Sequence, residues 1–437
     1  MKTFLKNFAI ASVLIFGAAN GASAQEDHKY IPTEENLKAR EEFRDNKFGV
    51  FIHWGIYSMI AHGEWLMNYD VNWQEYEKMA SGFYPSRFDA AQWVSAIKAA
   101  GAKYICFTSR HHDGFSMFDT RWCNYDIVDA TPFRRDVLKE LADECHKQGI
   151  KLHLYYSHID WRRDDYPIGR TGHDTGRELH PNWTQYYEFM NNQLTELLTN
   201  YGEIGAIWFD GLWDQDINPD FDWQLPPQYK MIHELQPSCL IGNNHHMTPN
   251  AGEDIQIFER DQPGENTAGL SGQDISALPL ETCQTMNGSW GYRIKDQNYK
   301  SVKELIHYLV ETAGKNANLL LNVGPQPNGE IPAAALERLK AMGEWLNVYG
   351  ETIYGTRDGD ISPRPWGVST RKGNKLYIHV LDLQDDGLYL PMTAKVTKAV
   401  QFVDKKEIEF KQDKGGVLLK FPKVPDDIDY VIELTVK

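Results

Sequence analysis

The sequence predicts an α/β protein: a (β/α)8-type TIM barrel, somewhat irregular, followed by a small C-terminal β-sandwich. Three observations predict this fold. Eight short apolar runs lie between residues 47 and 324, amphipathic stretches fill most of the gaps between them, and beyond Gly355 short strands alternate with turns. Near-continuous apolar runs indicate strands that are buried on both faces, as in the parallel sheet of a barrel.

The first 24 residues differ in character from the rest of the chain. Lys2 and Lys6 flank the start of an apolar run that ends at Phe16, and small residues then lead to Ala22-Ser23-Ala24. This pattern is typical of a cleavable signal peptide, because the run is too short to span a membrane and an A-x-A site follows it. No cysteine lies near that site. We therefore expect a secreted or periplasmic protein without a membrane anchor.

The expected barrel strands are the eight apolar runs themselves. In chain order they are Phe48–Trp54, Ala102–Thr108, Ile150–Tyr156, Ile204–Phe209, Ser238–Gly242, Ile255–Phe258, Leu280–Thr285 and Asn318–Val323. Four helical stretches between them end at a glycine, which favours a left-handed helix cap; these are Ala90–Ala100, Arg135–Gln148, Thr184–Tyr201 and Val302–Ala313. No helical period is visible between Ser238 and Phe258, so we expect loops there.

A last helix is expected from Pro332 to about Tyr349, and a β module follows it. The predicted strands of this module are Leu376–Leu381, Ala399–Val403, Ile408–Phe410, Val417–Phe421 and Tyr430–Val436. The expected organisation is therefore a signal peptide over residues 1–24, a barrel over residues 25–355 and a β-sandwich domain over residues 356–437.

Composition narrows the classes of function. The chain has 61 acidic and 45 basic residues and a net charge of −16, so nucleic acid and anionic membranes are poor partners. Its five cysteines are widely spaced and odd in number, which indicates neither a disulfide framework nor a zinc site and leaves one disulfide open. The 13 Trp and 22 Tyr residues suit carbohydrate stacking and equally suit a large core.

One carboxylate stands out at the end of a predicted strand. The apolar run that begins at Ile204 ends in Asp210, directly after Trp208 and Phe209. Burying a carboxylate beside such residues costs several kcal/mol unless it is paired or used, and barrels keep their chemistry at the C-terminal ends of their strands. Asp210 is therefore a catalytic candidate. The alternative is a residue that caps the next turn.

Histidine, carboxylate and aromatic residues recur at the same ends of other predicted strands. They include His53, Glu64 and Trp65 after the first strand, His111 and His112 after the second, Tyr155 and Asp160 at the third, and Glu259 and Asp261 after the sixth. Because several independent strands end in this way, the pattern favours a catalytic pocket over a capping role for Asp210.

These motifs resemble the retaining α-L-fucosidases of glycoside hydrolase family 29. The matching segments, in family order, are residues 47–55, 111–115, 155–157 with Asp160 and Trp161, 208–211 and 318–325. The resemblance covers nearly the whole barrel region. It implies an exo-acting enzyme that removes terminal α-L-fucose from oligosaccharides or glycoconjugates through a covalent fucosyl-enzyme intermediate, with no cofactor and no metal. It leaves the oligomeric state unknown.

The resemblance implies that Asp210 is the nucleophile and that a second carboxyl, roughly 5 to 5.5 Å away, is the acid/base. The pKa of this second group must be raised so that it holds a proton. Three glutamates compete for the role. We assign it to Glu259, which matches the family's acid/base segment, with a salt bridge to Arg260 or to another cation at the barrel rim as the alternative. Glu281 matches a structural glutamate, and Glu253 lies in an expected exposed loop.

The resemblance also implies which residues contact the sugar. They are His53, Glu64, Trp65, His111, His112, Tyr155, Trp208 and Trp290, and a neutral imidazole suits a hydroxyl group because it can donate and accept. Zinc ligation by the histidines is a weaker interpretation, because adjacent side chains on an extended segment point apart. His112 could instead be structural, and Trp208 could be ordinary core.

One departure from the family concerns the segment after the fifth strand. Many relatives carry an Arg there, whereas this chain reads Gly242-Asn243-Asn244-His245-His246. Either His245 or Asn244 takes over that contact, or the aglycone side differs. The aglycone is expected among the loops at residues 166–182 and 260–277. Two other functions stay open: a retaining glycosidase for a related sugar, such as an α-L-galactosidase, and a carbohydrate-binding barrel without catalysis.

Overall fold

A computed structural model describes residues 30–437 apart from Asp70 and Gln384. The predicted signal peptide, residues 1–24, lies outside the described residues. None of the helices within the described range is long and apolar enough to cross a lipid bilayer. All five cysteines are described, and all five are free thiols.

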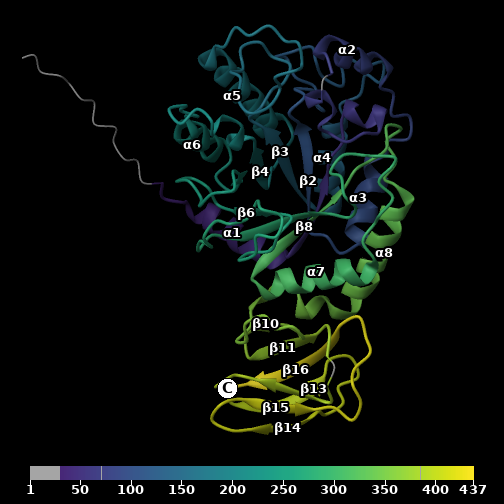
Figure 1. The fold of residues 1–437 in the computed structure, drawn as a ribbon, viewed down its shortest axis with the longest axis vertical. Helices are drawn as coiled ribbons and strands as arrows, with labels where there is room; N and C mark the ends of the chain where they lie inside the picture. The colour runs from purple at the N-terminus through teal and green to yellow at the C-terminus, as the bar shows by residue number, and fades with distance from the viewer. Residues whose placement is uncertain (1–29, 70, 384) are drawn as a thin grey trace, which may run out of the picture. The chain divides into compact units, whose positions relative to one another are not determined.

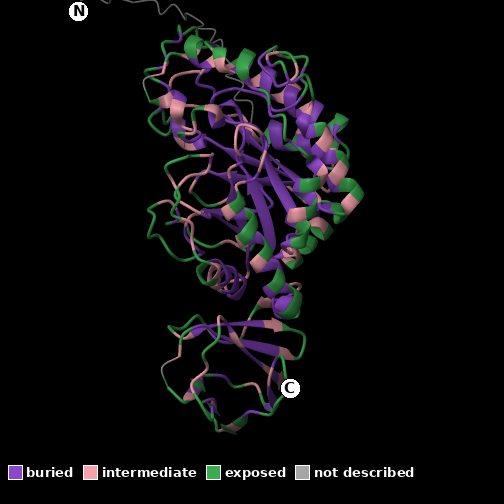
Figure 2. Ribbon diagram, turned by 90° about the vertical axis from the view of Figure 1, so that its right-hand side faces the viewer, coloured by how far each residue is buried: buried purple, intermediate pink, exposed green. Residues whose placement is uncertain are grey.

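Eight parallel strands form one sheet in the order β5-β4-β3-β2-β1-β8-β7-β6 (Figure 1). They are β1 (Phe48–Ile52), β2 (Tyr104–Arg110), β3 (Lys151–Ser157), β4 (Ala206–Asp210), β5 (Leu240–Asn244), β6 (Gln256–Glu259), β7 (Leu280–Thr285) and β8 (Ala317–Val323). A bridge between Gly242 and Ile255 joins β5 to β6 and nearly closes the barrel. All eight predicted strands are confirmed, and Figure 2 shows that they are buried, which is why they read as apolar runs.

The α-helices surround this sheet. They are α1 (Glu34–Asn46), α2 (Trp73–Glu77), α3 (Ala90–Ala99), α4 (Val137–Gln148), α5 (Trp183–Asn200), α6 (Leu225–Leu235), α7 (Val302–Gly314) and α8 (Ala333–Tyr349). The five predicted helices are confirmed as α3, α4, α5, α7 and α8, and no helix joins β5 to β6. Helix α1 escaped prediction because only Asn36 and Phe43 are buried along its charged sequence. Two prolines in the first turn obscured the start of α6.

The predicted glycine caps are right in three cases and wrong in one. Gly101, Gly149 and Gly202 follow their helices with positive φ angles of 90°, 72° and 76°. Gly314, in contrast, is the last residue of α7, and Lys315 is the C-cap. A Cβ atom at Gly314 would lie 2.6 Å from Cβ of Val368, so this glycine allows the C-terminal module to approach the helix closely.

The C-terminal module consists of two antiparallel sheets, β13-β16-β11-β10-β9 and β12-β15-β14. The strands are β9 (Arg357–Asp358), β10 (Gly367–Lys372), β11 (Lys375–Val380), β12 (Gly387–Leu390), β13 (Val396–Gln401), β14 (Glu409–Gln412), β15 (Val417–Lys420) and β16 (Tyr430–Val436). Buried side chains from both sheets form one hydrophobic cluster, as in a sandwich. The five predicted strands are confirmed; β9, β10 and β12 were missed because they are short or polar.

Gly343→Ala is expected to destabilise the barrel even though alanine is the better helix former. Gly343 lies in α8, and a Cβ atom there would lie 2.1 Å from the backbone oxygen of Ala99 at the end of α3. The helical gain of about 1 kcal/mol is smaller than an overpacking cost of up to about 3 kcal/mol against backbone. Urea unfolding should show a net loss of about 2 kcal/mol, with the exposed neighbour Glu344→Ala as a near-neutral control. A stabilised Gly343→Ala variant would contradict this packing.

Candidate active site

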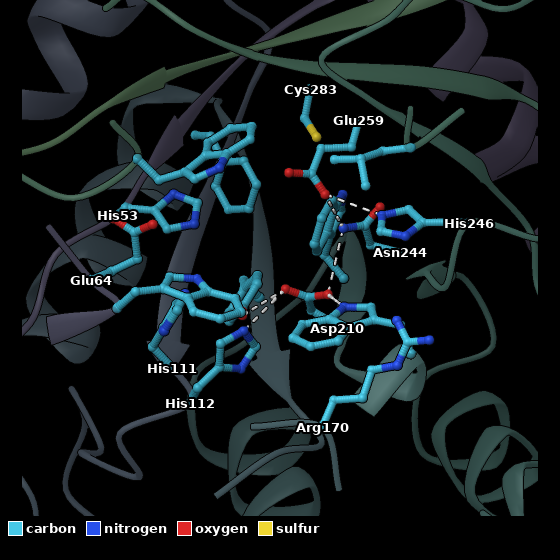
Figure 3. Close-up of a pocket in the computed structure, with 17 residues that line it drawn as sticks. His53, Glu64, His111, His112, Arg170, Asp210, Asn244, His246, Glu259 and Cys283 are labelled. Atoms are coloured by element: carbon cyan, nitrogen blue, oxygen red, sulfur yellow. Dashed lines mark hydrogen bonds and ion pairs between the residues drawn. The ribbon is translucent and has the colours of Figure 1, made fainter. Parts of the chain in front are cut away.

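A cavity of about 260 Å³ opens at the C-terminal ends of the barrel strands (Figure 3). All ten predicted site residues line it: His53, Glu64, Trp65, His111, His112, Tyr155, Trp208, Asp210, Glu259 and Trp290. Seven further residues share the lining, namely Phe51, Arg170, Trp213, Asn244, His246, Leu270 and Cys283. The barrel thus brings together residues that are separated by more than 200 positions in the sequence.

Asp210 is the last residue of β4 and lies among donors. The hydroxyl group of Tyr155 donates to its Oδ2 at 3.0 Å, and the indole Nε1 of Trp213 donates to its Oδ1 at 3.0 Å. Burial, together with the charge of Glu259, raises the pKa of Asp210 to about 6 despite these hydrogen bonds. The next residue, Gly211, has a φ of 108°, which lets the chain turn sharply away from the pocket.

Glu259 is the last residue of β6 and shares a neighbour with Asp210. The Nδ2 atom of Asn244 lies 2.8 Å from Glu259 Oε2 and 3.5 Å from Asp210 Oδ1. These two oxygens are therefore at most about 6.3 Å apart, the distance reached if the three atoms were in line. Inverting glycosidases separate their carboxyl groups by roughly 6.5 to 9.5 Å, whereas retaining ones use roughly 5 to 5.5 Å. The spacing fits a retaining pair.

The pKa of Glu259 departs from the sequence-based expectation. Burial raises the pKa, but hydrogen bonds from His246 and Asn244 and the charges of His246 and Arg260 outweigh burial and bring it below its ordinary value. The alternative salt bridge to Arg260 is not formed, because the Arg260 guanidinium lies over the ring of Trp290, 5.0 Å from its centroid. The partner of Glu259 is His246, with Nε2 at 3.2 Å from Oε2.

Three buried histidines form one wall of the cavity. His53 Nδ1 lies 2.6 Å from Asn322 Oδ1, and His112 Nδ1 lies 2.6 Å from Ser157 Oγ. Burial lowers the pKa of His53 and of His112 to about 3 and that of His111 well below its ordinary value, so all three rings are neutral. A neutral ring has a donor and an acceptor nitrogen, which suits hydroxyl groups.

The side chains of His111 and His112 do not point apart, contrary to the expectation from the sequence. His111 and His112 lie in a turn after β2 and not on an extended segment, and their ring centroids are 4.3 Å apart. Both rings therefore face the same cavity. Among the described residues, no group of three or more His, Cys, Asp or Glu side chains is arranged to hold a metal ion.

Indole rings form the remaining walls. Trp65 stacks on Trp213 with ring centroids 5.7 Å apart, and Trp208 stacks on Tyr155 at 5.5 Å. Glu64 accepts a hydrogen bond from the backbone N–H of Gly291 at 2.7 Å, and burial raises the pKa of Glu64. Trp208 faces the cavity and is therefore more than ordinary core.

The other two glutamates do not line the cavity. Glu281 lies in the barrel interior, where it accepts hydrogen bonds from Tyr104 Oη at 2.6 Å and from Trp208 Nε1 at 2.9 Å. Glu253 is buried and not exposed as expected, because it accepts from Tyr229, Asn250 and His245. Since His245 binds Glu253, the position after strand five that faces the catalytic pair is held by Asn244, with His246 beside it.

His246, Trp213 and Arg170 were not recognised from the sequence. A signal existed for Trp213, which lies three residues after Asp210 at the same strand end. Arg170 lies in the expected aglycone loop at residues 166–182, and Leu270 lies in the loop at residues 260–277. Neither loop has a period from which the direction of a single side chain could be predicted.

Glu281→Gln is expected to remove a pH-dependent loss of stability. Burial raises the pKa of Glu281 from its ordinary 4.5 to about 7, so the folded protein binds this proton more tightly than the unfolded chain does. The wild type therefore loses stability as the pH rises from about 4.5 to 7, by up to about 3 kcal/mol. Glutamine resembles the protonated carboxyl group, because its side chain is uncharged and has an acceptor oxygen and a donor NH2 group.

Urea unfolding of wild type and Glu281→Gln should give similar free energies at pH 4.5 and a more stable variant at pH 8. The exposed Glu34→Gln variant is the control and should follow the wild type at both pH values. A difference between Glu281→Gln and wild type that stays constant with pH would contradict the burial of a titrating carboxyl at this position.

Two neighbouring carboxylates lie at the strand ends of the barrel, in a cavity whose walls are neutral imidazole and indole rings. This is the arrangement of a retaining glycoside hydrolase. Comparison with known proteins agrees. The family model described as alpha-L-fucosidase matches residues 17–351. This chain belongs to the α-L-fucosidase family.

Three relatives illustrate the similarity. The plasma alpha-L-fucosidase of Homo sapiens is 30% identical over 389 residues, which cover 80% of this chain and 78% of the relative. The solved structure of alpha-L-fucosidase isoenzyme 1 from Paenibacillus thiaminolyticus is similar with a TM-score of 0.81 and 35% identity, and covers 92% of this chain and 100% of that one. A Bacteroides thetaiotaomicron family 29 alpha-L-fucosidase, solved as a trapped covalent intermediate with 2-fluoro-fucosyl fluoride, has a TM-score of 0.80 and 27% identity over 93% of this chain and 100% of that one.

Proposed function

We propose that the protein is an exo-acting retaining α-L-fucosidase that releases terminal α-L-fucose from oligosaccharides or glycoconjugates. The observation that carries the proposal is the contact of one Asn244 nitrogen with both Asp210 and Glu259, which keeps one oxygen of each carboxylate within about 6.3 Å of the other and so below the separation of an inverting pair. Family membership supports fucose as the sugar.

Asp210 is the proposed nucleophile. A carboxylate oxygen of Asp210 forms a bond to the anomeric carbon while the bond from that carbon to the glycosidic oxygen breaks and Glu259 gives its proton to the leaving oxygen. In the second step Glu259 takes a proton from water, the water oxygen bonds to the anomeric carbon, and Asp210 leaves as a carboxylate. Tyr155 and Trp213 orient the nucleophile through their hydrogen bonds.

Glu259 must hold a proton in the first step and release it before the second. Its lowered pKa suits the second step. Burial is the largest single influence on this pKa, and a sugar that fills the cavity excludes water and strengthens that influence. Substrate binding therefore favours the protonated form that the first step needs.

The neutral rings of His53, His111 and His112, together with Glu64, are the proposed partners of the fucose hydroxyl groups. Trp65, Trp208 and Trp290 supply apolar faces for the sugar ring and its methyl group. Tyr155 donates a hydrogen bond to the nucleophile, and its ring stacks on Trp208 in this wall. Arg170 and Leu270 belong to the loops at residues 166–182 and 260–277, which form the proposed aglycone side.

The signal-like sequence of residues 1–24 supports a secreted or periplasmic location. The β-sandwich has a hydrophobic cluster of its own, formed by residues between 361 and 436, which supports separate domains over residues 25–355 and 356–437. Neither a cofactor nor a metal has a part in the proposed chemistry.

The test of this function is proton NMR of the first sugar released from 4-nitrophenyl α-L-fucoside. We expect free fucose that appears first as the α-anomer, since two displacements restore the configuration. Release of β-fucose would contradict a retaining mechanism. Faster cleavage of the matching α-L-galactoside would instead favour the related glycosidase, and binding of fucose without cleavage of either glycoside would favour a non-catalytic barrel.

A further inference from the structure

The two oxygens of Glu259 are in unequal surroundings. Oε2 accepts a hydrogen bond from Asn244 Nδ2 at 2.8 Å and lies 3.2 Å from Nε2 of His246. Among the described residues, no side chain or backbone group is hydrogen-bonded to Oε1. Figure 3 shows His246 and Asn244 on the same side of the Glu259 carboxyl group. The carboxyl is therefore held by one oxygen and leaves the other for the substrate.

His246 is held in place by an unusual backbone conformation. It follows β5 with a φ of 61°, in the left-handed region that non-glycine residues seldom adopt and that costs about 1 kcal/mol. Its side chain is 20% exposed, so the ring can exchange protons with solvent while one nitrogen faces Glu259. A strained residue whose ring contacts a catalytic carboxylate suggests a functional constraint at this position.

Several charged groups surround this imidazole. Glu259 faces it from the end of β6, and Asp210, at the end of β4, is near enough for the charge of His246 to lower its pKa. Arg260 follows Glu259, and Arg170 reaches the same cavity from the loop after β3. His246 thus favours the ionised forms of both catalytic carboxylates, because its charge lowers the pKa of each, and Arg260 adds to this effect at Glu259.

We propose that His246 is the positioning residue of the acid/base: with Asn244 it holds Oε2 of Glu259, so that Oε1 delivers the proton to the leaving group and later removes one from water. This inference rests on the proposed function and extends it to a residue that has no assigned role. The proton on Oε1 moves to the glycosidic oxygen in the first step and is replaced by a proton of water in the second.

The test compares His246→Ala and His246→Gln with the wild type on two substrates over a range of pH. One substrate is 4-nitrophenyl α-L-fucoside, whose leaving group needs little acid assistance. The other is the natural fucosyl oligosaccharide that the wild type cleaves fastest. The control is His146→Gln, since His146 is exposed in the last turn of α4 and does not line the cavity.

We expect His246→Ala to lower kcat/KM about 10- to 100-fold on the oligosaccharide and less than about threefold on the aryl fucoside. The basic limb of the kcat/KM profile should move to higher pH in both variants, because His246 lowers the pKa of both Glu259 and Asp210. His246→Gln keeps an N–H donor and should retain more of the oligosaccharide rate, while His146→Gln should match the wild type.

Equal losses on both substrates with an unshifted basic limb in both variants would overturn the inference and leave the proposed function intact. If His246→Ala does not fold, the basic limb of the His246→Gln profile tests the inference by itself, and an unshifted limb overturns it. A wild type that cleaves neither substrate overturns the proposed function and the inference with it.

Discussion

Asp210→Gly is expected to lower kcat on an aryl α-L-fucoside by about 10⁴-fold or more, because no other carboxylate is placed to form the covalent intermediate. The fold should tolerate the change. Burial already raises the pKa of Asp210 to about 6, so removing this carboxylate relieves a desolvation cost while it sacrifices the contacts with Tyr155 and Trp213. Initial rates with a coupled fucose assay and melting temperatures would measure both effects.

The space left by Asp210→Gly offers a second readout. Added azide should enter it, attack the anomeric carbon from the side of the missing carboxylate and restore part of the rate with inverted configuration. Asp220→Gly, which changes an exposed residue in the segment between β4 and α6, is the control and should keep wild-type activity. The assignment would be refuted if a 2-fluoro-fucosyl fluoride label were found on a wild-type peptide that lacks Asp210.

Glu259→Ala is expected to lower kcat/KM on a natural fucosyl oligosaccharide by about 10²- to 10⁴-fold, the range of general acid catalysis. The loss of kcat/KM on 4-nitrophenyl α-L-fucoside should be much smaller, because this leaving group departs without a proton. Azide should then accelerate turnover of the variant and give a fucosyl azide with retained configuration, since Asp210 still forms the intermediate. Steady-state kinetics on both substrates with product NMR would measure these effects.

The matched control is Glu337→Ala, because Glu337 is exposed on α8 and does not line the cavity. This variant should behave as wild type on both substrates. Equal losses on the two substrates in Glu259→Ala, or an azide product of inverted configuration, would show that Glu259 is not the acid/base.

The barrel could be predicted because its strands are buried on both faces. Each of the eight strands appears in the sequence as an apolar run. Because the strands are parallel, the residues that follow the runs meet at one end of the barrel, however the side chains pack. Asp210, His53 and Glu259 were therefore found from their place after a strand. Strands β10 and β12, in contrast, are short and partly exposed, and their sequences Gly367–Lys372 and Gly387–Leu390 lack a distinct apolar period.

The surroundings of the acid/base could not be predicted from the sequence. Three glutamates lie near the ends of strands: Glu253, Glu259 and Glu281. Only the folded chain shows that Glu259 lines the cavity, whereas the other two accept hydrogen bonds from buried donors. His245 and His246 are adjacent and identical in kind. The left-handed backbone at His246 directs its ring toward Glu259, whereas His245 binds Glu253.

The sequence by itself determined the barrel and the strand ends that carry chemistry, because both follow from periodic burial along the chain. Its resemblance to the family then indicated ten of the side chains that line the cavity. Only the tertiary structure decided which oxygen of Glu259 is held, which histidine holds it and how the pKa values of Glu259 and Asp210 shift. Those properties depend on distances of 3 to 4 Å between side chains from different strands, and electrostatic interactions at that range change with every neighbour and with the water that burial excludes.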